Sequence, residues 1–426
     1  MGGVTDNSVK DFLTKAVESL IYTKMNIKIL LYLLLSLLTI TIGCRAPMEP
    51  IIARPDYDRP LLPGQQALRK ITDPSQIPDF TSASLDLNGL KPAIENSLNY
   101  LRKSSSKRHF PVSGITHQRA VDSLEAFMGL LDSDTRGADL NAAIRDKFDV
   151  YMSVGCDNWG TVLYTGYYTP NFEGSFRPSE RFRYPLYKQP KDLVKGPDGQ
   201  IFGRRGADGK IVPYPPRAVI EDEMLFKGGE LAWLGSQFEV YIAHVQGSAK
   251  IRLSNGEIRT VGYAANNGHE YKSIVEELIK DGRISGEQMS LAAMIDYFEN
   301  HPGQVPKYTR MNPRFVFFRE EEGEPRGSLN EPVTPNRTIA TDKLIFPRGC
   351  LSFVSTTLPK FTGGQVVLYP YSGFALDQDT GGAIRAAGRC DIYIGQGDTA
   401  GELAGRIYQE GKLYYLFLKS SDPFAQ

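Results

Sequence analysis

Carboxylates gather in a short stretch near the end of this chain. Asp377 and Asp379 lie in the sequence Ala-Leu-Asp-Gln-Asp-Thr-Gly-Gly-Ala-Ile, and Asp391 and Asp398 follow closely. If several of these carboxylates converge, their mutual repulsion raises the pKa of at least one and makes it a usable general acid. The small residues beside Asp379 leave room for a bulky ligand, as the wall of a cleft requires. The alternative is a set of unrelated turn and capping residues, since Asp is a preferred turn residue.

Three other kinds of site fit the sequence poorly. Gly395 and Gly397 suggest a phosphate loop, but the next glycine is Gly401 and no P-loop lysine follows. The Asp-Thr-Gly that begins at Asp379 matches half of an aspartic protease site, which needs two carboxylates sharing a proton, and it occurs only once. The five histidines are scattered, without His-Glu-x-x-His or paired Cys-x-x-Cys sequences. We therefore expect no metal and no cofactor.

The sequence predicts helices in the part of the chain before residue 151 and strands in the part that carries the four aspartates. Apolar residues recur at spacings of three and four along residues 87–101, 121–131 and 140–151, which predicts three packing helices. Aromatic and β-branched runs then predict a mainly β region. Its predicted strands span residues 161–168, 251–253, 258–261, 314–319, 365–369, 391–394 and 413–418.

Turn and capping signals complete this outline. Asn255-Gly256 predicts a hairpin turn, and residues 195–216 read as long exposed hairpin loops. A capping box beginning at Ser285 predicts a helix that runs to Phe298. A second capping signal predicts a helix that opens at Thr399.

Composition limits the partners of the chain. It has 426 residues, 41% hydrophobic, and its 49 Lys+Arg balance 49 Asp+Glu, so the net charge is zero. This length suggests two or three globular domains. A balanced chain without a basic stripe lacks the charge excess that binding to nucleic acid or to an anionic membrane would favour. We therefore expect a neutral or mixed partner and no nucleic acid.

The N-terminus carries an export signal. Residues 29–42 form an apolar run preceded by Lys24 and Lys28, too short for a transmembrane helix but suited to a signal peptide. Residues 1–43 are therefore predicted as the signal peptide; Met25 is an alternative start. The run ends at Thr41-Ile42-Gly43-Cys44, which resembles a bacterial lipobox and predicts lipidation of Cys44. An ordinary signal peptide with an incidental cysteine is the alternative.

The residues after Cys44 indicate a location. Arg45 stands where an Asp would favour retention at the inner membrane, so we predict an outer-membrane lipoprotein facing the periplasm. Residues 44–85 are rich in Pro, Asp and Ser and are predicted as a tether. Lipidation leaves three cysteines in an oxidising compartment, so at most one internal disulfide can form, and we expect Cys350 to pair with Cys390.

Five sequence motifs together carry a family resemblance. Their order is similar to that of the membrane-bound lytic murein transglycosylase A family, and the resemblance covers residues 164–418. The motifs are Thr165-Gly-Tyr-Tyr-Thr-Pro170, His244-Val-Gln-Gly-Ser248, Asn267-Gly-His-x-Tyr-x-Ser-Ile274, Asn312-Pro-x-Phe-Val-Phe-Phe318 and Asp379-Thr-Gly-Gly-Ala-Ile384.

The resemblance implies a fold of two β-domains. The chain would be mainly β with helices, with a double-psi β-barrel domain into which a second β-barrel domain is inserted. Residues 86–170 and 314–426 would form the helices and the double-psi barrel, and residues 171–313 the insert. A glycan groove would run between the two β-domains, and the N-terminal helices would pack on the first.

The resemblance also implies roles for the acids. The three acids of the family's three-aspartate domain would fall on Asp342, Asp379 and Asp391, with Asp391 as the catalytic acid and the other two as support. Asp379 is the second candidate, because Arg385-Ala386 stands where the family commonly has Lys-Gly. Asp377 has no clear role, and Asp398 would cap the helix near Thr399.

The implied reaction is cleavage of peptidoglycan between N-acetylmuramic acid and N-acetylglucosamine, giving 1,6-anhydro ends. Asp391 would act first as acid and then as base, and we expect its pKa to be raised by desolvation and by neighbours such as Asp379. Tyr167, Tyr168, Gln246 and Ser248 are expected to contact sugars, with at most one tyrosine in the groove. A wall-binding lipoprotein without activity and an aspartic protease are the alternatives. Complexes for wall synthesis and remodelling are further expected partners.

Overall fold

The computed structural model describes residues 11–20, 22–23, 55–196, 199–286 and 290–420. It divides into two units, residues 1–54 and Pro55–Gln426. In the first unit residues 11–20 are helical. Along the described ranges, no helix combines the length and the apolar character needed to cross a membrane. The apolar run 29–42 and Cys44 lie outside these ranges, so the export signal and the lipidation stay predictions.

Six strands of the second unit close into a barrel. Strand β17 pairs with β14 on one side and with β3 on the other, which joins the ends of the order β17-β14-β15-β13-β16-β3. Two pairings are parallel, β13 with β15 and β3 with β16. The predicted double-psi barrel is confirmed. Its strands are β3 (Val162–Thr169), β13 (Thr338–Ala340), β14 (Leu351–Thr362), β15 (Gln365–Asp379), β16 (Arg389–Gln396) and β17 (Tyr408–Leu418).

The segment before the helices is part of the folded body. Strand β1 (Leu68–Lys70) pairs with β2 (Phe148–Ser153), which in turn pairs with β17. Phe80 is fully buried and its ring lies 4.8 Å from that of Phe353. The predicted tether is therefore wrong for residues 55–85, because a few apolar side chains and one strand dock this segment without any sequence periodicity.

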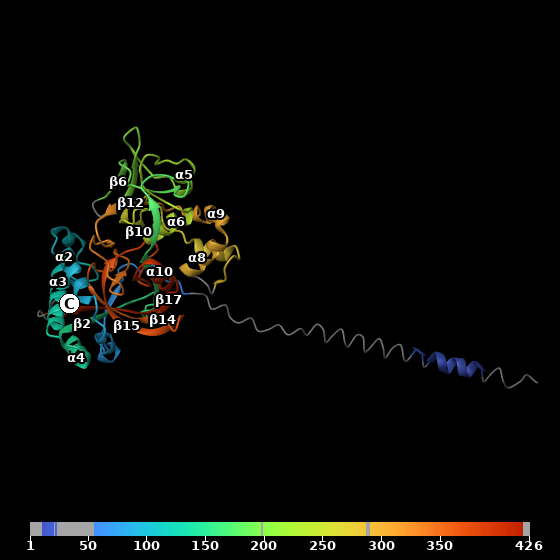
Figure 1. Ribbon diagram of the computed structural model, residues 1–426. Coiled ribbons are helices and arrows are strands. Elements are labelled where there is room, and N and C mark those ends of the chain that lie inside the picture. Colours follow the sequence, from blue (N-terminus) through green and yellow to red (C-terminus); the bar gives the residue numbers. More distant parts are fainter. Residues whose placement is uncertain (1–10, 21, 24–54, 197–198, 287–289, 421–426) are drawn as a thin grey trace, which may run out of the picture. The chain divides into compact units, whose positions relative to one another are not determined.

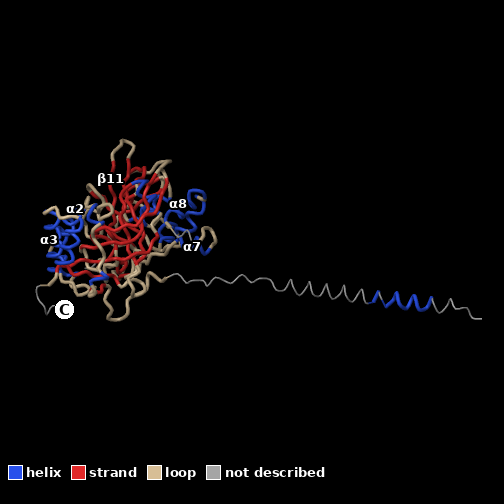
Figure 2. Tube along the Cα trace, turned by 90° about the horizontal axis from the view of Figure 1, so that it is seen from below, coloured by secondary structure: helices blue, strands red, loops and turns tan. Residues whose placement is uncertain are grey.

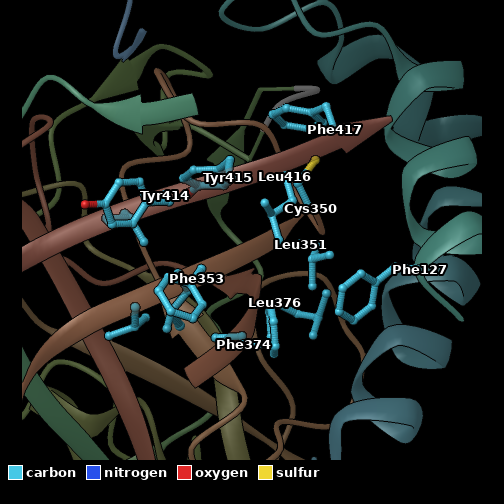
Figure 3. Packing of buried hydrophobic residues seen from close by; sticks show 14 of the residues in the cluster. Phe127, Cys350, Leu351, Phe353, Phe374, Leu376, Tyr414, Tyr415, Leu416 and Phe417 are labelled. Atoms are coloured by element: carbon cyan, nitrogen blue, oxygen red, sulfur yellow. The ribbon is translucent and has the colours of Figure 1, made fainter. Parts of the chain in front are cut away.

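Three helices cover one side of the barrel, as Figure 1 shows. They are α2 (Leu90–Leu101), α3 (His117–Asp132) and α4 (Gly137–Lys147). Figure 3 shows Phe127 of α3 directed at the barrel core, where its ring lies 5.1 Å from that of Phe374. The third predicted helix is too long. It ends at Lys147, because Phe148 and Tyr151 belong to β2, whose pairing with β17 overrides their helical spacing.

A second sheet is inserted between β3 and β13. Its strand order is β12-β11-β10-β4-β9-β5, and an isolated bridge between Lys188 and Phe318 joins its two ends. The predicted boundary at residue 313 is too early, since β12 pairs with β11 of this sheet. The strands are β4 (Asn171–Ser175), β5 (Tyr184–Tyr187), β9 (Glu230–Leu234), β10 (Ser248–Arg252), β11 (Ile258–Asn266) and β12 (Val316–Glu321). The predicted turn at Asn255-Gly256 joins β10 to β11.

Residues 195–216 hold a small sheet rather than loops alone. It contains β6 (Leu193–Lys195), β7 (Ile201–Arg205) and β8 (Ile211–Val212) in that order. Figure 2 shows α7 and α8 outside the strands. The remaining helices are α5 (Arg217–Asp222), α6 (Gln237–Gln246), α7 (Ile274–Lys280), α8 (Leu291–Asn300), α9 (Val305–Thr309) and α10 (Gly397–Gly405).

Two predicted helix starts are wrong. Helix α8 begins at Leu291, because the hydroxyl of Ser290 accepts from the amide of Ala293 and caps the helix there. Helix α10 begins at Gly397, before Thr399, with Gln396 as N-cap residue. The predicted disulfide is also wrong, because Cys350 and Cys390 are both free and buried. Cys350 precedes β14, and two strands separate β14 from β16, which carries Cys390.

Candidate active site

Asp391 stands in the barrel wall with its neighbours fixed by strand register. It is the third residue of β16 and lies opposite Ala340 of β13 and Thr165 of β3. The Thr165 side chain and the Ile392 amide act on its carboxyl group and lower its pKa. The Oδ1 atom is buried and has no hydrogen-bond partner among the described residues. One oxygen of this carboxyl group thus stays unsatisfied in the protein alone.

Asp379 ends β15 and is held by three donors. Its Oδ2 accepts from the hydroxyl of Tyr167 at 2.9 Å, and its Oδ1 accepts from the amides of Ser328 and Thr380, both at 2.8 Å. The ring of Tyr167 packs 5.1 Å from that of Tyr393. Both oxygens of Asp379 are therefore occupied, unlike those of Asp391.

The pKa of Asp391 differs from that of an ordinary aspartate because of its surroundings. Burial raises the pKa of Asp391 from 3.8 to about 7; Arg389 and the hydrogen bond from Thr165 oppose this shift, and the charge of Asp379 adds to it. The pKa of Asp379 is raised by burial too, against the hydrogen bonds from Thr380, Ser328 and Tyr167. The expected rise for Asp391 and its two causes are confirmed.

A carboxyl group whose pKa is raised by folding lowers the free energy of unfolding at a pH where the group ionises. The folded chain holds the Asp391 proton up to about pH 7, whereas the unfolded chain releases it near 3.8, so stability falls as the pH rises through this window. We expect Asp391→Asn, which cannot ionise, to be more stable than the native chain at about pH 8, and the gain to shrink toward about pH 4. Urea unfolding over this range measures the difference. A gain that grows toward acid pH would contradict the assignment.

Asp342 fixes the loop that leads into β16. Its side chain is 6% exposed, its Oδ2 accepts from the amide of Ala386 at 3.0 Å, and its Oδ1 accepts from the amide of Leu344 at 3.0 Å. Ala386 has a φ of 62°, in the left-handed region that favours glycine. Ala386, which stands where the family commonly has Gly, thus lies at a strained backbone position. The hydrogen bond from its amide to Asp342 holds the loop there.

We expect Ala386→Gly to keep or raise stability, by up to about 1 kcal/mol, because relief of the left-handed strain offsets the greater freedom of glycine in the unfolded chain. Ala142, exposed in α4, is the matched control. There the same change should cost about 1 kcal/mol, as it does in ordinary helices. Chemical denaturation of both variants measures the difference. Equal losses would argue against strain at Ala386.

Asp377 belongs to a buried network behind Asp379. It is fully buried and pairs with the ammonium group of Lys343, which is 7% exposed. Its Oδ2 also accepts from the hydroxyls of Thr341 at 2.8 Å and Tyr415 at 2.7 Å. Thr341 donates its amide to the carbonyl of Asp379 at 3.2 Å. The network therefore supports the backbone that carries Asp379.

The four residues predicted to contact sugar divide into two groups. Tyr167 reaches Asp379, whereas Tyr168 is 8% exposed and packs against α10, which favours core packing over a sugar contact for Tyr168. Gln246 accepts from the amide of Tyr168 at 2.9 Å. Ser248 lies 3.2 Å from the hydroxyl of Thr169. Gln246 and Ser248 thus connect the inserted sheet to the barrel.

Other motif residues hold the chain in place. His244 is buried, and burial together with Arg217 lowers its pKa well below the usual range. Asn267 donates to the carbonyls of Pro215 and Pro313 at 3.0 and 2.9 Å. Asp398 is exposed in the first turn of α10 and makes no capping hydrogen bond, so its predicted capping role is wrong.

Sequence reasoning missed Thr165, Ser328 and Lys343. Ser328 donates its backbone amide to Asp379, and almost any residue type could do the same, so the sequence does not reveal this role. Lys343 follows Asp342 directly, but its partner Asp377 comes much later in the chain. Thr165 lay inside a quoted motif, and only strand register places it beside Asp391.

Two alternative site types receive no support. Among the described residues, no group of three or more His, Cys, Asp or Glu side chains could hold a metal ion. Within the same ranges, no hydrogen bond joins Asp379 to Asp391, as a proton shared between these two carboxylates would require.

Comparison with known families matches both β-domains. Residues 163–319 match the MltA specific insert domain, and residues 337–417 match the 3D domain. Membrane-bound lytic murein transglycosylase A of Vibrio cholerae is 30% identical over 270 residues, 63% of this chain and 68% of that protein. The chain belongs to the membrane-bound lytic murein transglycosylase A family. The family member of Escherichia coli K12 is 29% identical over 356 residues, 82% of this chain and 87% of that protein.

Solved structures of this family share the fold. A membrane-bound lytic murein transglycosylase from Agrobacterium tumefaciens gives a TM-score of 0.68 at 27% identity, covering 83% of this chain and 98% of that chain. The structure of E. coli MltA with bound chitohexaose gives 0.62 at 25% identity, covering 85% and 97%. The predicted family and fold are both confirmed.

Proposed function

We propose that this chain is a lytic transglycosylase that cleaves peptidoglycan between N-acetylmuramic acid and N-acetylglucosamine. The observation that carries the proposal is the Asp391 carboxyl group, whose Oδ1 is buried without a partner among the described residues and whose pKa is raised to about 7. Such a group is protonated often enough near neutral pH to donate a proton. Family membership supplies the substrate class, since a relative has been solved with bound chitohexaose.

The proposed reaction needs one acid. Asp391 protonates the glycosidic oxygen as the bond from the muramic anomeric carbon to that oxygen breaks. The 6-hydroxyl oxygen of the same muramic acid then bonds to the anomeric carbon, and the Asp391 carboxylate takes the hydroxyl proton. Atoms balance without water, and attack within one sugar brings a high effective concentration. A hydrolase would need a second carboxylate to activate water or form an intermediate.

Asp379 and Asp342 act in this proposal as positioning residues. The charge of Asp379 helps to keep the proton on Asp391, and Tyr167 fixes the orientation of Asp379. Asp342 holds the loop at Ala386 and so sets where β16 begins. Of the two tyrosines predicted to contact sugar, we retain Tyr167. We also retain Gln246 and Ser248, which connect the inserted sheet to the barrel.

Purified chain lacking residues 1–43 tests the proposal on isolated sacculi. Release of products with 1,6-anhydro-muramic ends, identified by mass spectrometry, is the expected result. Reducing-end products would indicate a hydrolase, and binding without release would favour the wall-binding protein. Inhibition by pepstatin would revive the protease alternative.

The pKa of Asp391 predicts the pH dependence of cleavage. Because the reacting form carries the proton, we expect kcat/KM to fall about tenfold per pH unit above about 7, as deprotonation removes that form. Initial rates of anhydro-product release from sacculi between about pH 5 and pH 9 measure the profile. A rate that stays flat into alkaline pH would count against Asp391 as the acid.

We further propose that Cys44 is lipidated and that the chain is held on the outer membrane facing the periplasm. Support comes from the lipobox-like sequence before Cys44, from Arg45 and from the names of relatives, which are described as membrane-bound. Peptidoglycan strands would be the main partner, and wall synthesis and remodelling complexes further ones. Labelling of cells with a fatty-acid analogue, followed by Cys44→Ala, tests the anchor.

A further inference from the structure

A two-stranded ribbon extends from the barrel and exposes apolar side chains. Strand β14 pairs with β17 only as far as Ser355, opposite Lys412. Beyond Thr356 it is paired only with β15 among the described strands, up to Thr362 opposite Gln365. The six residues from Thr357 to Thr362 extend about 20 Å at about 3.4 Å per residue.

Toward its tip, one face of this ribbon carries apolar side chains. Phe361 lies opposite Val366, and Pro359 lies opposite Leu368, and residues directly opposite share a face. Phe361 is 41% exposed and Leu368 is 54% exposed. Val367, on the other face beside Lys360, is 37% exposed. An exposed apolar strand pair of this kind is an aggregation hazard unless something covers it.

Trp159 stands near the base of the ribbon. It is 76% exposed, and its carbonyl accepts from the ammonium group of Lys412 at 2.6 Å. Lys412 is the residue opposite Ser355, at the point where the ribbon leaves the barrel. Exposed tryptophan is enriched at membrane–water interfaces, where its ring is apolar and its N–H reaches water.

The chain enters the folded unit at this same place. The hydroxyl of Tyr57 donates to Glu410 Oε1 at 2.7 Å, and the hydroxyl of Thr356 donates to the carbonyl of Glu410 at 2.9 Å. Cys44 is eleven residues before Pro55, so a lipid on Cys44 would keep Pro55 within about 40 Å of the bilayer even at full extension.

We propose that the ribbon tip and Trp159 form a second membrane contact, in which Phe361, Leu368 and Trp159 enter the lipid surface. The occupant to which we commit is the phospholipid bilayer, and the argument rests on the proposed anchor at Cys44. The connection from Cys44 to Pro55 is short, and the base of the ribbon lies next to the entry point at Tyr57. The contact would fix the orientation of the barrel relative to the peptidoglycan wall.

Tryptophan fluorescence tests the contact without any need for activity. The chain has two tryptophans, so Trp233→Phe leaves Trp159 as sole reporter. Chain 44–426 is coupled through Cys44 to a maleimide phospholipid in phosphatidylethanolamine and phosphatidylglycerol vesicles. The other cysteines, Cys156, Cys350 and Cys390, are buried, which directs the coupling to Cys44. Brominated acyl chains then quench any tryptophan that enters the lipid.

We expect a loss of Trp159 emission and a shift of its maximum to shorter wavelength on brominated vesicles. Phe361→Ser with Leu368→Ser should weaken the quenching roughly tenfold, because it removes two apolar groups from the lipid. Phe202→Ser is the matched control: Phe202 is 52% exposed in β7, and its loss should leave quenching unchanged.

Two results would overturn the proposal. One is Trp159 emission that stays at its value in solution although the chain is coupled to the vesicles. The other is a double variant that keeps full quenching but loses binding to isolated sacculi, which would make the wall polymer the occupant. Since the lipid is attached chemically, neither result depends on lipidation in the cell or on transglycosylase activity.

Discussion

Asp391→Asn is expected to lower the release of anhydro-muropeptides by about a thousandfold or more, because loss of a general acid costs about 10² to 10⁴ and this residue serves twice in the proposed reaction. Asn keeps the shape of Asp but carries no acidic proton. The rate of product release from sacculi, followed by mass spectrometry, measures the loss. Thermal unfolding of the same sample shows that the variant is folded.

Asp398→Asn is the matched control for this loss. Asp398, in the first turn of α10, is also an acid, but it is exposed and makes no capping hydrogen bond. We expect its replacement to leave the rate within about twofold of the native value, as surface changes usually do. If Asp379→Asn abolishes release while Asp391→Asn retains it, Asp379 is the acid and the assignment is wrong.

Lys343→Met is expected to destabilise the barrel by about 3 to 5 kcal/mol, since it leaves the carboxylate of Asp377 buried without its cation. Asp377 is fully buried, and its remaining donors are the hydroxyls of Thr341 and Tyr415. Equilibrium unfolding in urea measures the change. Because Thr341 also holds the backbone of Asp379, activity should fall along with stability.

Two comparisons separate burial of a charge from loss of a side chain. Lys91→Met removes the partner of Asp132 in an exposed pair 2.8 Å apart and should cost less than about 1 kcal/mol. The double variant Lys343→Met with Asp377→Leu should regain most of the lost stability, because it removes both charges. A double variant as unstable as Lys343→Met alone would show that packing, rather than the unpaired charge, causes the loss.

Periodicity predicted the helices well and their ends poorly. Helices α2 and α3 follow apolar spacing, which survives folding because one face of each packs on the barrel. The end of α4 was missed, since Phe148 and Tyr151 continue a helical spacing but pair with β17, far along the chain. Residues 55–85 were missed for a similar reason, as the docking of Phe80 depends on partners in β14 and β15.

The candidate site, too, could be predicted only in part from the sequence. Motif order pointed to Asp342, Asp379 and Asp391, and all three take part in the loop and strand ends around β16. Sequence could not separate Tyr167 from Tyr168, because neighbouring residues of a strand face opposite sides and nothing local says which side is the core. The barrel decides it, with Tyr168 against α10 and Tyr167 on Asp379.

By itself the sequence determined the family, the mainly β fold and the group of carboxylates, since residue types and their order carry that information. Only the tertiary structure distinguished the environments of these acids. Burial raises the pKa of Asp391 and leaves its Oδ1 without a partner among the described residues, whereas Asp377 is neutralised by Lys343 and Asp398 faces solvent. A pKa depends on solvent exclusion and on charges brought together by folding, and linear sequence records neither.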